Sequence, residues 1–337
     1  MRRTLVQHIF SKQYVVSYQM NILLIGLGSI GTRHVTNLLS LGYKKISIVS
    51  RKEQLPGEFS KCIYFKNLED ALQHQTYDAA IICTATTQHA TELIQLLRHK
   101  VKLIYVEKPI SNSLEHIEII KQLANSYTNR IIVGFDLHFD PGMQKTKELL
   151  QSNAPGKIIS VNAFVGQYLP QWRPYEDHRK GMSAKKETGG GVLLDLVHEF
   201  EYLYRLFGDI DEIKCYARDT GALEIETEES ADVLLKFKSG VTGTVHLDYW
   251  QQQLMRYTII TGTEGTIIWN LAEKFVQLTN KLGTEKFSFA NAERNDRFLT
   301  AMKNFLEDKD DDRFSTLEDG IKSLEIVLAA KRSAGLI

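Results

Sequence analysis

The sequence predicts an α/β protein with two domains: a doubly wound parallel sheet, then an α+β domain with a large, mostly antiparallel open sheet. The chain has 337 residues, more than a single core usually supports. In residues 20–140, apolar runs alternate with helical stretches, as in a parallel sheet covered by helices. After about residue 156, short alternating segments separated by glycine turns take over, which is typical of an antiparallel sheet.

The strands expected in the first domain are continuous apolar runs, because both faces of a parallel sheet are buried. They are 21–28, 44–52, 77–86, 101–106 and 130–136. The segments between them place apolar residues at helical spacing. These predicted helices are 29–43, 67–75, 89–100 and 113–126.

The second domain is expected to be rich in strands, with three helices. The strand-like segments are 157–169, 212–219, 230–240, 241–250, 256–270 and 275–281, and the helices are 192–207, 293–307 and 316–334. We therefore divide the chain into an extension (1–19), a dinucleotide-type domain (20–140) and a substrate and oligomerisation domain (141–337). We expect the extension to be poorly ordered, or the natural start to be Met20, and the last helix to pack back on the first domain.

Composition narrows the class of protein. Lys+Arg and Asp+Glu both number 41, so the chain lacks the overall charge that nucleic acid or an anionic membrane surface would attract. No apolar run reaches the length of a membrane span. Cys62, Cys83 and Cys215 are widely separated, with no metal-ligand spacing. We expect a cytoplasmic protein with no structural metal.

A glycine-rich loop follows the first strand. "GLGSIG" places Gly26, Gly28 and Gly31 in a GxGxxG pattern, with Ser29 and Ile30 between them, and a helix follows. In that context the glycines permit a tight turn, approach of a pyrophosphate and close packing of helix on strand. The alternative is a glycine turn with no ligand. We predict a dinucleotide site.

The end of the second strand bears on which dinucleotide binds. NAD-binding domains usually place an acidic residue there, on the ribose 2′-hydroxyl. Here the residues are Ser50, Arg51 and Lys52. Ser50 leaves room and Arg51 suits a 2′-phosphate, so NADP(H) is favoured over NAD(H). The alternative is that Arg51 and Lys52 form only a solvated turn.

Two further stretches carry reactive side chains. "YVEKPIS" ends a predicted strand on Glu107, Lys108 and Pro109, at the sheet edge where ligands of α/β proteins bind. In the helix 192–207, Asp195, His198, Glu199 and Tyr202 share one face, opposite an apolar stripe. Histidine titrates in the range needed to move a hydroxyl proton. The alternative for Lys108 is that it is merely paired with a neighbouring acid. The alternative for the helix 192–207 is that these residues form a polar surface face.

These stretches, in this order with "CTATTQHA" (83–90) and "GTEGTI" (262–267), resemble the Gfo/Idh/MocA family (glucose–fructose oxidoreductase/inositol dehydrogenase) of NAD(P)-dependent enzymes. The resemblance covers nearly everything from Met20 onward. It implies that Lys108 contacts both nicotinamide and substrate, that His198 carries the proton and that Asp195 orients it. It implies that Thr84, Thr87 and His89 line the cofactor and that Glu107 lies near the nicotinamide ribose. Pro109 is a candidate for a cis peptide bond.

The sequence also departs from the family pattern. His198 follows Asp195 by three residues, where four is commonest. In "GFDLHFDPG" (134–142), Asp136 stands where the family usually has Asn, and His138 where it usually has Arg. These differences put the local cofactor and substrate contacts in doubt.

The segment 170–187 bears on the substrate. It contains Trp172, Arg173 and four other basic residues, and in this fold it would lie over the cofactor mouth. An aromatic stacks on a sugar face and arginines bind carboxylate or phosphate, so an acidic or nucleotide-linked sugar fits. A solvated loop fits equally well, since acidic residues offset part of the charge.

We therefore expect an NADP(H)-dependent oxidoreductase acting on a CH–OH group or ketone of a sugar, sugar acid or nucleotide sugar, as in bacterial surface-sugar metabolism. Lys108, His198 and Asp195 would be catalytic, and Trp172 and Arg173 would join them in binding substrate. One alternative is a dinucleotide-binding sensor without turnover, and another is elimination chemistry with tightly held NAD. The broad second sheet predicts a homodimer or homotetramer.

Overall fold

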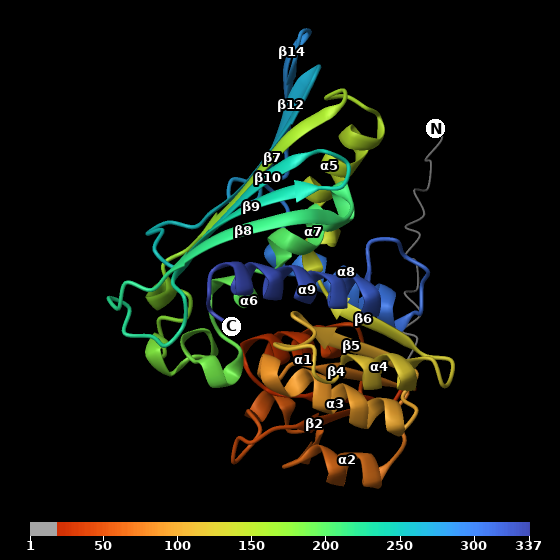
Figure 1. Cartoon of the computed structure of the whole chain (residues 1–337). Helices are drawn as coiled ribbons and strands as arrows, with labels where there is room; N and C mark the ends of the chain where they lie inside the picture. Colours follow the sequence, from red (N-terminus) through yellow and green to blue (C-terminus); the bar gives the residue numbers. More distant parts are fainter. Residues whose placement is uncertain (1–18) are drawn as a thin grey trace, which may run out of the picture.

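The computed structural model describes residues 19–337, so the expectation for residues 1–19 lies outside them except at Gln19. These residues form two β-sheets, one below the other in Figure 1, with helices around the first and between the two. The expected succession of a parallel sheet and a mostly antiparallel sheet is confirmed.

The first sheet has the strand order β15-β6-β5-β4-β1-β2-β3. Its strands are β1 Ile22–Ile25, β2 Ile46–Val49, β3 Ile63–Phe65, β4 Ala79–Ile82, β5 Leu103–Glu107, β6 Arg130–Gly134 and β15 Ser315–Thr316. All neighbours pair in parallel except β15, which runs antiparallel to β6. Because the carboxyl ends of the parallel strands share one edge, the segments after β1, β2, β4, β5 and β6 gather there.

Helices cover both faces of this sheet. They are α1 Ser29–Ser40, α2 Leu68–His74, α3 Thr86–Arg98, α4 Ile117–Ala124 and α8 Arg294–Leu306. Successive β1 residues point to opposite faces: Ile22 and Leu24 pack in the cluster that holds α1 and α8, and Leu23 and Ile25 in the cluster that holds α2, α3 and α4. The buried apolar strands of the sequence are thus sandwiched between helices from both ends of the chain.

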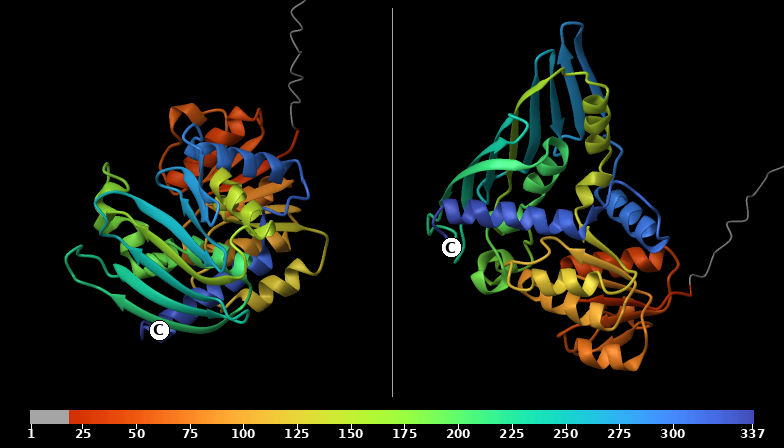
Figure 2. Two further views of the ribbon diagram at one scale, coloured as in Figure 1. Left: turned by 90° about the horizontal axis from the view of Figure 1, so that it is seen from above. Right: turned by 45° about the vertical axis from the view of Figure 1, so that its right-hand side comes forward.

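The second sheet has the order β14-β13-β12-β11-β7-β10-β9-β8. Its strands are β7 Ile158–Gly166, β8 Ile210–Arg218, β9 Ser230–Phe237, β10 Thr242–Asp248, β11 Met255–Gly262, β12 Gly265–Asn270, β13 Phe275–Asn280 and β14 Gly283–Ser288. Only β7 and β10 pair in parallel. Burial alternates along β9 because one face packs on helices (Figure 2). The other face is open and exposes Ile159, Tyr216 and Leu234.

The remaining helices are α5 Pro141–Gln151, α6 Val192–Asp195, α7 His198–Phe207 and α9 Leu317–Ser333. Helix α5 and strands β3, β14 and β15 were not predicted. The expectation of one helix over 192–207 is wrong, because it stops after Asp195 and resumes at His198. At the break the carbonyl of Asp195 accepts a hydrogen bond from Lys108 Nζ at 2.6 Å. This contact joins the segment between α6 and α7 to the end of β5 in the first sheet.

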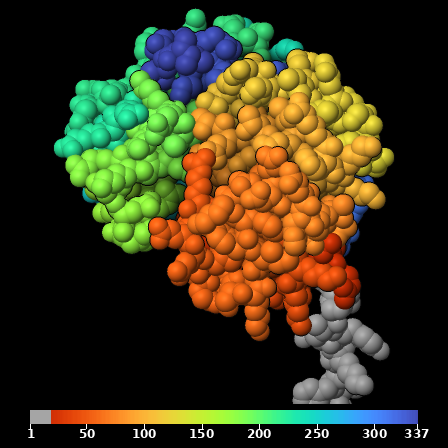
Figure 3. Space-filling model, turned by 90° about the horizontal axis from the view of Figure 1, so that it is seen from below, coloured from red at the N-terminus to blue at the C-terminus, as the bar shows by residue number. Residues whose placement is uncertain are grey.

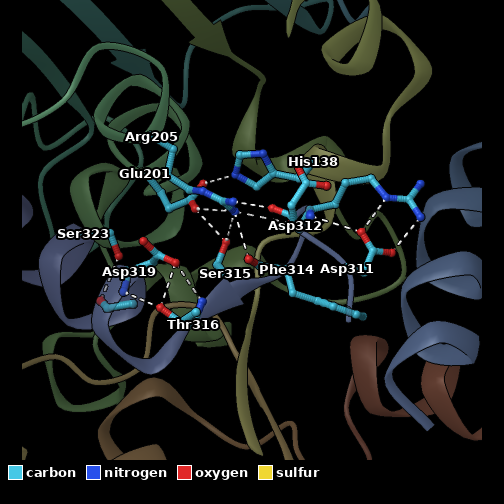
Figure 4. Close-up of polar contacts among 12 residues, drawn as sticks. His138, Glu201, Arg205, Asp311, Asp312, Phe314, Ser315, Thr316, Asp319 and Ser323 are labelled. Atoms are coloured by element: carbon cyan, nitrogen blue, oxygen red, sulfur yellow. Dashed lines mark hydrogen bonds and ion pairs between the residues drawn. The ribbon is translucent and has the colours of Figure 1, made fainter. Parts of the chain in front are cut away.

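A buried acid in α7 ties the second half of the chain to the first sheet. Glu201 is 1% exposed, and its carboxylate accepts from Ser315 Oγ at 2.6 Å and from His138 Nε2 at 2.7 Å (Figure 4). Arg205 lies 3.8 Å from the same carboxylate and donates to the carbonyl of Phe314. One side chain thereby joins α7, β15 and the turn after β6.

Replacing Glu201 should therefore destabilise the fold. Glu201→Ala leaves the buried imidazole of His138 and the hydroxyl of Ser315 without their acceptor, and breaking such a buried pair costs about 3–5 kcal/mol. We expect a loss of that size in the free energy of unfolding from urea titration. Glu325→Ala is the matched control, because its ion pair with Lys322 is on the surface and should cost less than about 0.5 kcal/mol. Equal small losses in both variants would contradict this account.

Candidate active site

The glycine loop connects β1 to α1 and leaves room for a ligand at its second glycine. Gly26 has φ +95°, and a Cβ on it would lie 2.7 Å from the Cys83 carbonyl carbon. A Cβ on Gly31 would lie 2.0 Å from the Gly26 oxygen, whereas a Cβ on Gly28 would meet nothing within 4 Å. The first and third glycines are thus required by packing, and the second faces open space.

The start of α1 supplies the donors that a pyrophosphate needs. No side chain caps this helix at Gly28, so the first-turn N–H groups, beginning with those of Ser29 and Ile30, have no side-chain acceptor. A helix N-terminus with free N–H groups beside an open glycine suits an anionic phosphate. The residues present therefore fit a dinucleotide cofactor.

Ser50 and Arg51, at the end of β2, differ in their exposure to solvent. Ser50 is buried, and its Oγ accepts from the Lys52 amide at 3.2 Å. Arg51 is exposed, and no residue in the range 19–337 forms an ion pair with it. Its charge acts on Glu92 of α3, where burial raises the pKa to about 7 while the hydrogen bond from Thr84 and the charge of Arg51 lower it. Arg51 is thus near enough to Glu92 for its charge to act on that carboxyl.

Thr84, Thr87 and His89, which were predicted to line the cofactor, form hydrogen bonds between the loop after β4 and neighbouring segments. Thr84 Oγ1 donates to Glu92 at 2.5 Å, and Thr87 Oγ1 donates to the carbonyl of Glu187 at 3.1 Å. His89 is buried with its ring nitrogens 2.8 Å from the Pro109 carbonyl and 3.1 Å from the Thr84 carbonyl. His89 therefore joins the loop after β4 to the loop after β5.

Glu107 is directed back toward α1. Its carboxylate is buried and lies 2.7 Å from Nε2 of His34. The His34 ring also meets Tyr105 edge-on, with centroids 5.5 Å apart. Glu107 therefore fixes the strand end against the helix that begins at the glycine loop.

Lys108 points across to the second half of the chain. The peptide bond between Lys108 and Pro109 is cis, as the sequence suggested. The ammonium donates to the carbonyl of Asp195. The Asp195 carboxylate accepts from the Tyr249 hydroxyl at 2.7 Å. Lys108 and Asp195 thus lie together, with the acid's side chain already engaged.

His198 lies at the start of α7, 8% exposed. Its Nε2 is 3.6 Å from Oδ1 of Asp136, in the turn Asp136–Phe139 after β6. Among residues 19–337, Asp136 is the carboxylate within ion-pair distance of this ring, a position that the sequence analysis gave to Asp195. Because the helix is interrupted between α6 and α7, Asp195 and His198 do not lie on one helical face.

Two arginines surround this pair. Arg297 of α8 binds the other oxygen of Asp136 through its Nε. Arg256 of β11 binds Glu199 in two-point fashion, at 2.8 and 3.0 Å. Burial, then the charges of Arg256, Lys108 and Arg297, lower the pKa of His198 well below its usual value. His198 is therefore neutral at pH 7 and able to accept a proton.

The segment 170–187 lies beside the first domain in the view from below (Figure 3). Trp172 packs edge-on against Tyr249, centroids 5.3 Å apart, and donates to the Gln167 carbonyl. Arg173 pairs with Glu176, and Arg179 pairs with Asp177 and Glu224. Much of the charge that suggested an anion site here is thus paired within the segment or with its neighbours.

Sequence reasoning missed Tyr249, Arg256 and Arg297, which come from separate strands and helices. Asp136 was noted only as a departure from the family pattern, and that departure was the available signal. Within the range 19–337, no three His, Cys, Asp or Glu side chains are grouped to hold a metal ion, and no helix is long and apolar enough to cross a membrane.

The two halves of the chain match family models. Residues 20–135 match the GFO_IDH_MocA oxidoreductase family with an NAD-binding Rossmann fold, and residues 143–268 match the GFO/IDH/MocA C-terminal domain. Among curated proteins, myo-inositol 2-dehydrogenase of Thermotoga maritima is 25% identical, covering 93% of this chain and 96% of that protein. scyllo-Inositol 2-dehydrogenase (NAD⁺) of Bacillus subtilis is 26% identical, covering 80% of this chain and 79% of that protein.

Solved structures are similar along nearly the whole chain. Myo-inositol 2-dehydrogenase of Lactobacillus plantarum has a TM-score of 0.78 at 20% identity, covering 94% of this chain and 97% of that one. The WlbA dehydrogenase of Bordetella pertussis, in complex with NADH and UDP-GlcNAcA, has a TM-score of 0.77 at 20% identity, covering 94% and 96%. At these identities, the likeness shows a shared fold.

The raised pKa of Glu92 makes a prediction for stability. The carboxyl keeps its proton to about pH 7 when folded, against 4.5 for the free side chain. The folded state binds more protons between these values, so its free energy of unfolding should fall as pH rises through them. Glu92→Gln should remove a fall on the order of 2–3 kcal/mol.

Urea titrations at pH 5, 6, 7 and 8 measure this difference. Glu69→Gln is the control, because Glu69 is an exposed acid in the first turn of α2 and should leave the pH dependence of the wild type unchanged. Parallel curves for wild type and Glu92→Gln would show that Glu92 is ionised across this range.

Proposed function

This chain belongs to the Gfo/Idh/MocA family of NAD-binding oxidoreductases, and on that premise we propose an NADP(H)-dependent enzyme for sugars. It moves a hydride between the nicotinamide and a hydroxyl-bearing carbon, or ketone, of a sugar, sugar acid or nucleotide sugar. The observation that carries the proposal is the meeting of Lys108 with the Asp195–His198 segment at the carboxyl edge of the first sheet. The named relatives support a CH–OH substrate, because they are inositol dehydrogenases.

His198 is the proton carrier in this proposal. When bound, the nicotinamide supplies or accepts the hydride. The neutral imidazole takes the hydroxyl proton as an alcohol is oxidised and returns it when a ketone is reduced. Asp136, 3.6 Å from Nε2, stabilises the cationic ring that forms, and Arg297 binds the other oxygen of Asp136.

Lys108 assists at the reacting oxygen. An ammonium group has three donors, and one of them is held by the Asp195 carbonyl. The others remain for a substrate oxygen, whose developing charge the ammonium stabilises. Tyr249 binds the Asp195 carboxylate and so holds that acid for a substrate hydroxyl.

The preference for NADP(H) rests on Ser50 and Arg51. Ser50 is small and turned inward, and Arg51 has no carboxylate partner among residues 19–337. A 2′-phosphate would supply that partner. NAD(H) is the alternative, supported by the NADH in the WlbA complex and the NAD⁺ in the name of the B. subtilis relative.

Assembly and location complete the proposal. We expect a homodimer or homotetramer formed through the open face of the second sheet, where Tyr216 is 79% and Leu234 55% exposed.

Cys62, Cys83 and Cys215 are free, as expected in the reducing cytoplasm. The UDP-GlcNAcA in the WlbA complex supports a nucleotide sugar as the substrate, and we propose a role in bacterial surface-sugar metabolism. A sensor that binds the dinucleotide without turnover is the second candidate, favoured by the unusual Asp136 and His138.

The cofactor proposal is tested by fluorescence titration with NADPH and NADH. We expect NADPH to bind at least tenfold more tightly, because a charge-assisted hydrogen bond is worth about 1.5–3 kcal/mol. Arg51→Ala should reduce the affinity for NADPH and leave that for NADH unchanged. Lys44→Ala, an exposed cation before β2, is the control. Equal binding of the two cofactors would make the enzyme NAD(H)-dependent or unselective, and binding of neither would refute the dinucleotide site.

The catalytic roles are tested by steady-state kinetics on a sugar found by screening. His198→Ala should lower kcat by about 10²–10⁴-fold, and Lys108→Ala by about 10²–10³-fold. Neither variant should weaken cofactor binding to the same degree. Full cofactor binding with no turnover on any sugar or polyol in the screen would favour the sensor.

Asp136 and Asp195 are separated by their pH profiles. Asp136→Asn removes the negative charge beside His198, which lowers the pKa of the imidazole. The acid limb of kcat/KM for oxidation should therefore move to lower pH. Asp195→Asn should leave the position of that limb unchanged, because Tyr249 occupies its carboxylate. The reverse result would make Asp195 the acid that orients His198.

A further inference from the structure

A cavity of about 320 Å³ lies on the α8 side of the proposed active site. Its walls come from the turn Asp136–Phe139 and the start of α5, the start of β11, the turn from β12 to β13, and the first turns of α8. None of the residues predicted from the sequence as catalytic or binding lines it. The cavity is therefore additional to the Lys108–His198 site.

The cavity nevertheless adjoins that site through two arginines. Arg256 lines it and also contributes to the lowered pKa of His198. Arg297 lines it and binds Asp136, the acid that faces His198. Arg256 and Arg297 thus lie between the cavity and the surroundings of His198.

The acidic residues of the cavity are already engaged. Asp140 caps α5 by accepting from the amide of Gly142 at 2.9 Å and lies 3.7 Å from Arg297. Glu293 and Asp296 form a reciprocal capping box at the start of α8. Each carboxylate has its partner in the backbone or in Arg297.

Two cationic residues at the opening of the cavity, Arg294 and Lys274, are not paired with an acid among the described residues. Within the range 19–337, neither Arg294 nor Lys274 has a carboxylate within ion-pair distance. Lys274 donates only to the Ala290 carbonyl, at 3.4 Å. Partial burial, then the charges of Arg297 and Arg33, lower the pKa of Arg294. Arg294 and Lys274 are therefore cations without a direct ion-pair partner in the described part of the chain, at an opening that also carries the carboxylates of Glu293 and Asp296.

The wall between these cations is apolar. Leu271, Phe275 and Phe289 line the cavity and are half-buried. Such a surface suits the carbon skeleton of a ligand, while the rim suits a negatively charged group. The combination disfavours a small neutral polyol, which has no charge for the rim.

We propose that this cavity binds a carboxylate or phosphate group of the substrate, held by Arg294 and Lys274 while the reacting hydroxyl lies at His198. The inference rests on the proposed function and narrows it to acidic or phosphorylated sugars. It differs from the names of the inositol-dehydrogenase relatives, whose substrates are neutral.

Calorimetric titration of the protein saturated with its preferred nicotinamide cofactor tests this. The probes are inorganic phosphate, glucose 1-phosphate, glucuronate and glucose, and saturating cofactor keeps phosphate from the glycine loop. We expect saturable binding of at least one anion and at least tenfold weaker binding of glucose. Preference for glucose 1-phosphate or for glucuronate identifies the phosphate or the carboxylate as the recognised group.

Variants locate the site. Arg294→Ala and Lys274→Ala should each weaken anion binding at least fivefold, and Arg294→Lys should retain part of it. Lys281→Ala, in the exposed turn between β13 and β14, should have no effect. Absence of saturable binding for all the anions, or binding that the Arg294 and Lys274 variants leave unchanged, would overturn the inference.

These failures are distinguishable from failure of the proposed function. If the cofactor binds and His198→Ala loses turnover while anions do not bind at Arg294, only the substrate inference is wrong. If no nicotinamide cofactor binds, the proposed function itself is wrong.

Discussion

The structure depends on one short turn, Asp136–Phe139, between the last parallel strand of the first sheet and α5. Its first residue faces His198 and Arg297, and its third faces Glu201. Both contacts are to α7 or its neighbours, so the turn fixes α7 relative to the carboxyl edge of the first sheet. Any chemistry that uses Lys108 and His198 together requires that relation.

Buried charges around this turn are tolerated because each has a counterpart. Glu199 is fully buried but binds Arg256 at two points, and Glu201 is shared by a histidine, a serine and an arginine. Removing a charge from water is expensive, and only close pairing with further hydrogen bonds compensates it. Nδ1 of His198 has no hydrogen-bond partner among residues 19–337, and the same is true of Nδ1 of His138 and of His34. What distinguishes His198 is therefore its contact with Asp136 near Lys108, not its unpartnered nitrogen.

Local sequence patterns predicted much of the fold and the loops of the site. The continuous apolar runs and the glycine loop are local signals: β1, β2, β4 and β6 fall within their predicted ranges, and β5 extends one residue beyond its range. Helix α5 was missed, although Asp140 and Pro141 form a typical helix start. The break between α6 and α7 was not visible because the apolar stripe continues through it, and the carbonyl at the break binds Lys108, 87 residues earlier. Asp136, Arg256 and Arg297 meet only after folding, so no spacing in the sequence could bring them together.

The two-residue strand β15 also affects the order in which the chain folds. Ser315 and Thr316 pair with Ile132 and Val133 at the outer edge of the first sheet. Until the ribosome has released this part of the chain, β6 is an open strand edge able to pair with other molecules. During synthesis, the N-terminal half therefore emerges with the edge of β6 exposed. Strand β15 covers that edge only when the last part of the chain has been made. Truncation before Ser315 would consequently favour aggregation of a sheet whose parallel strands are all intact.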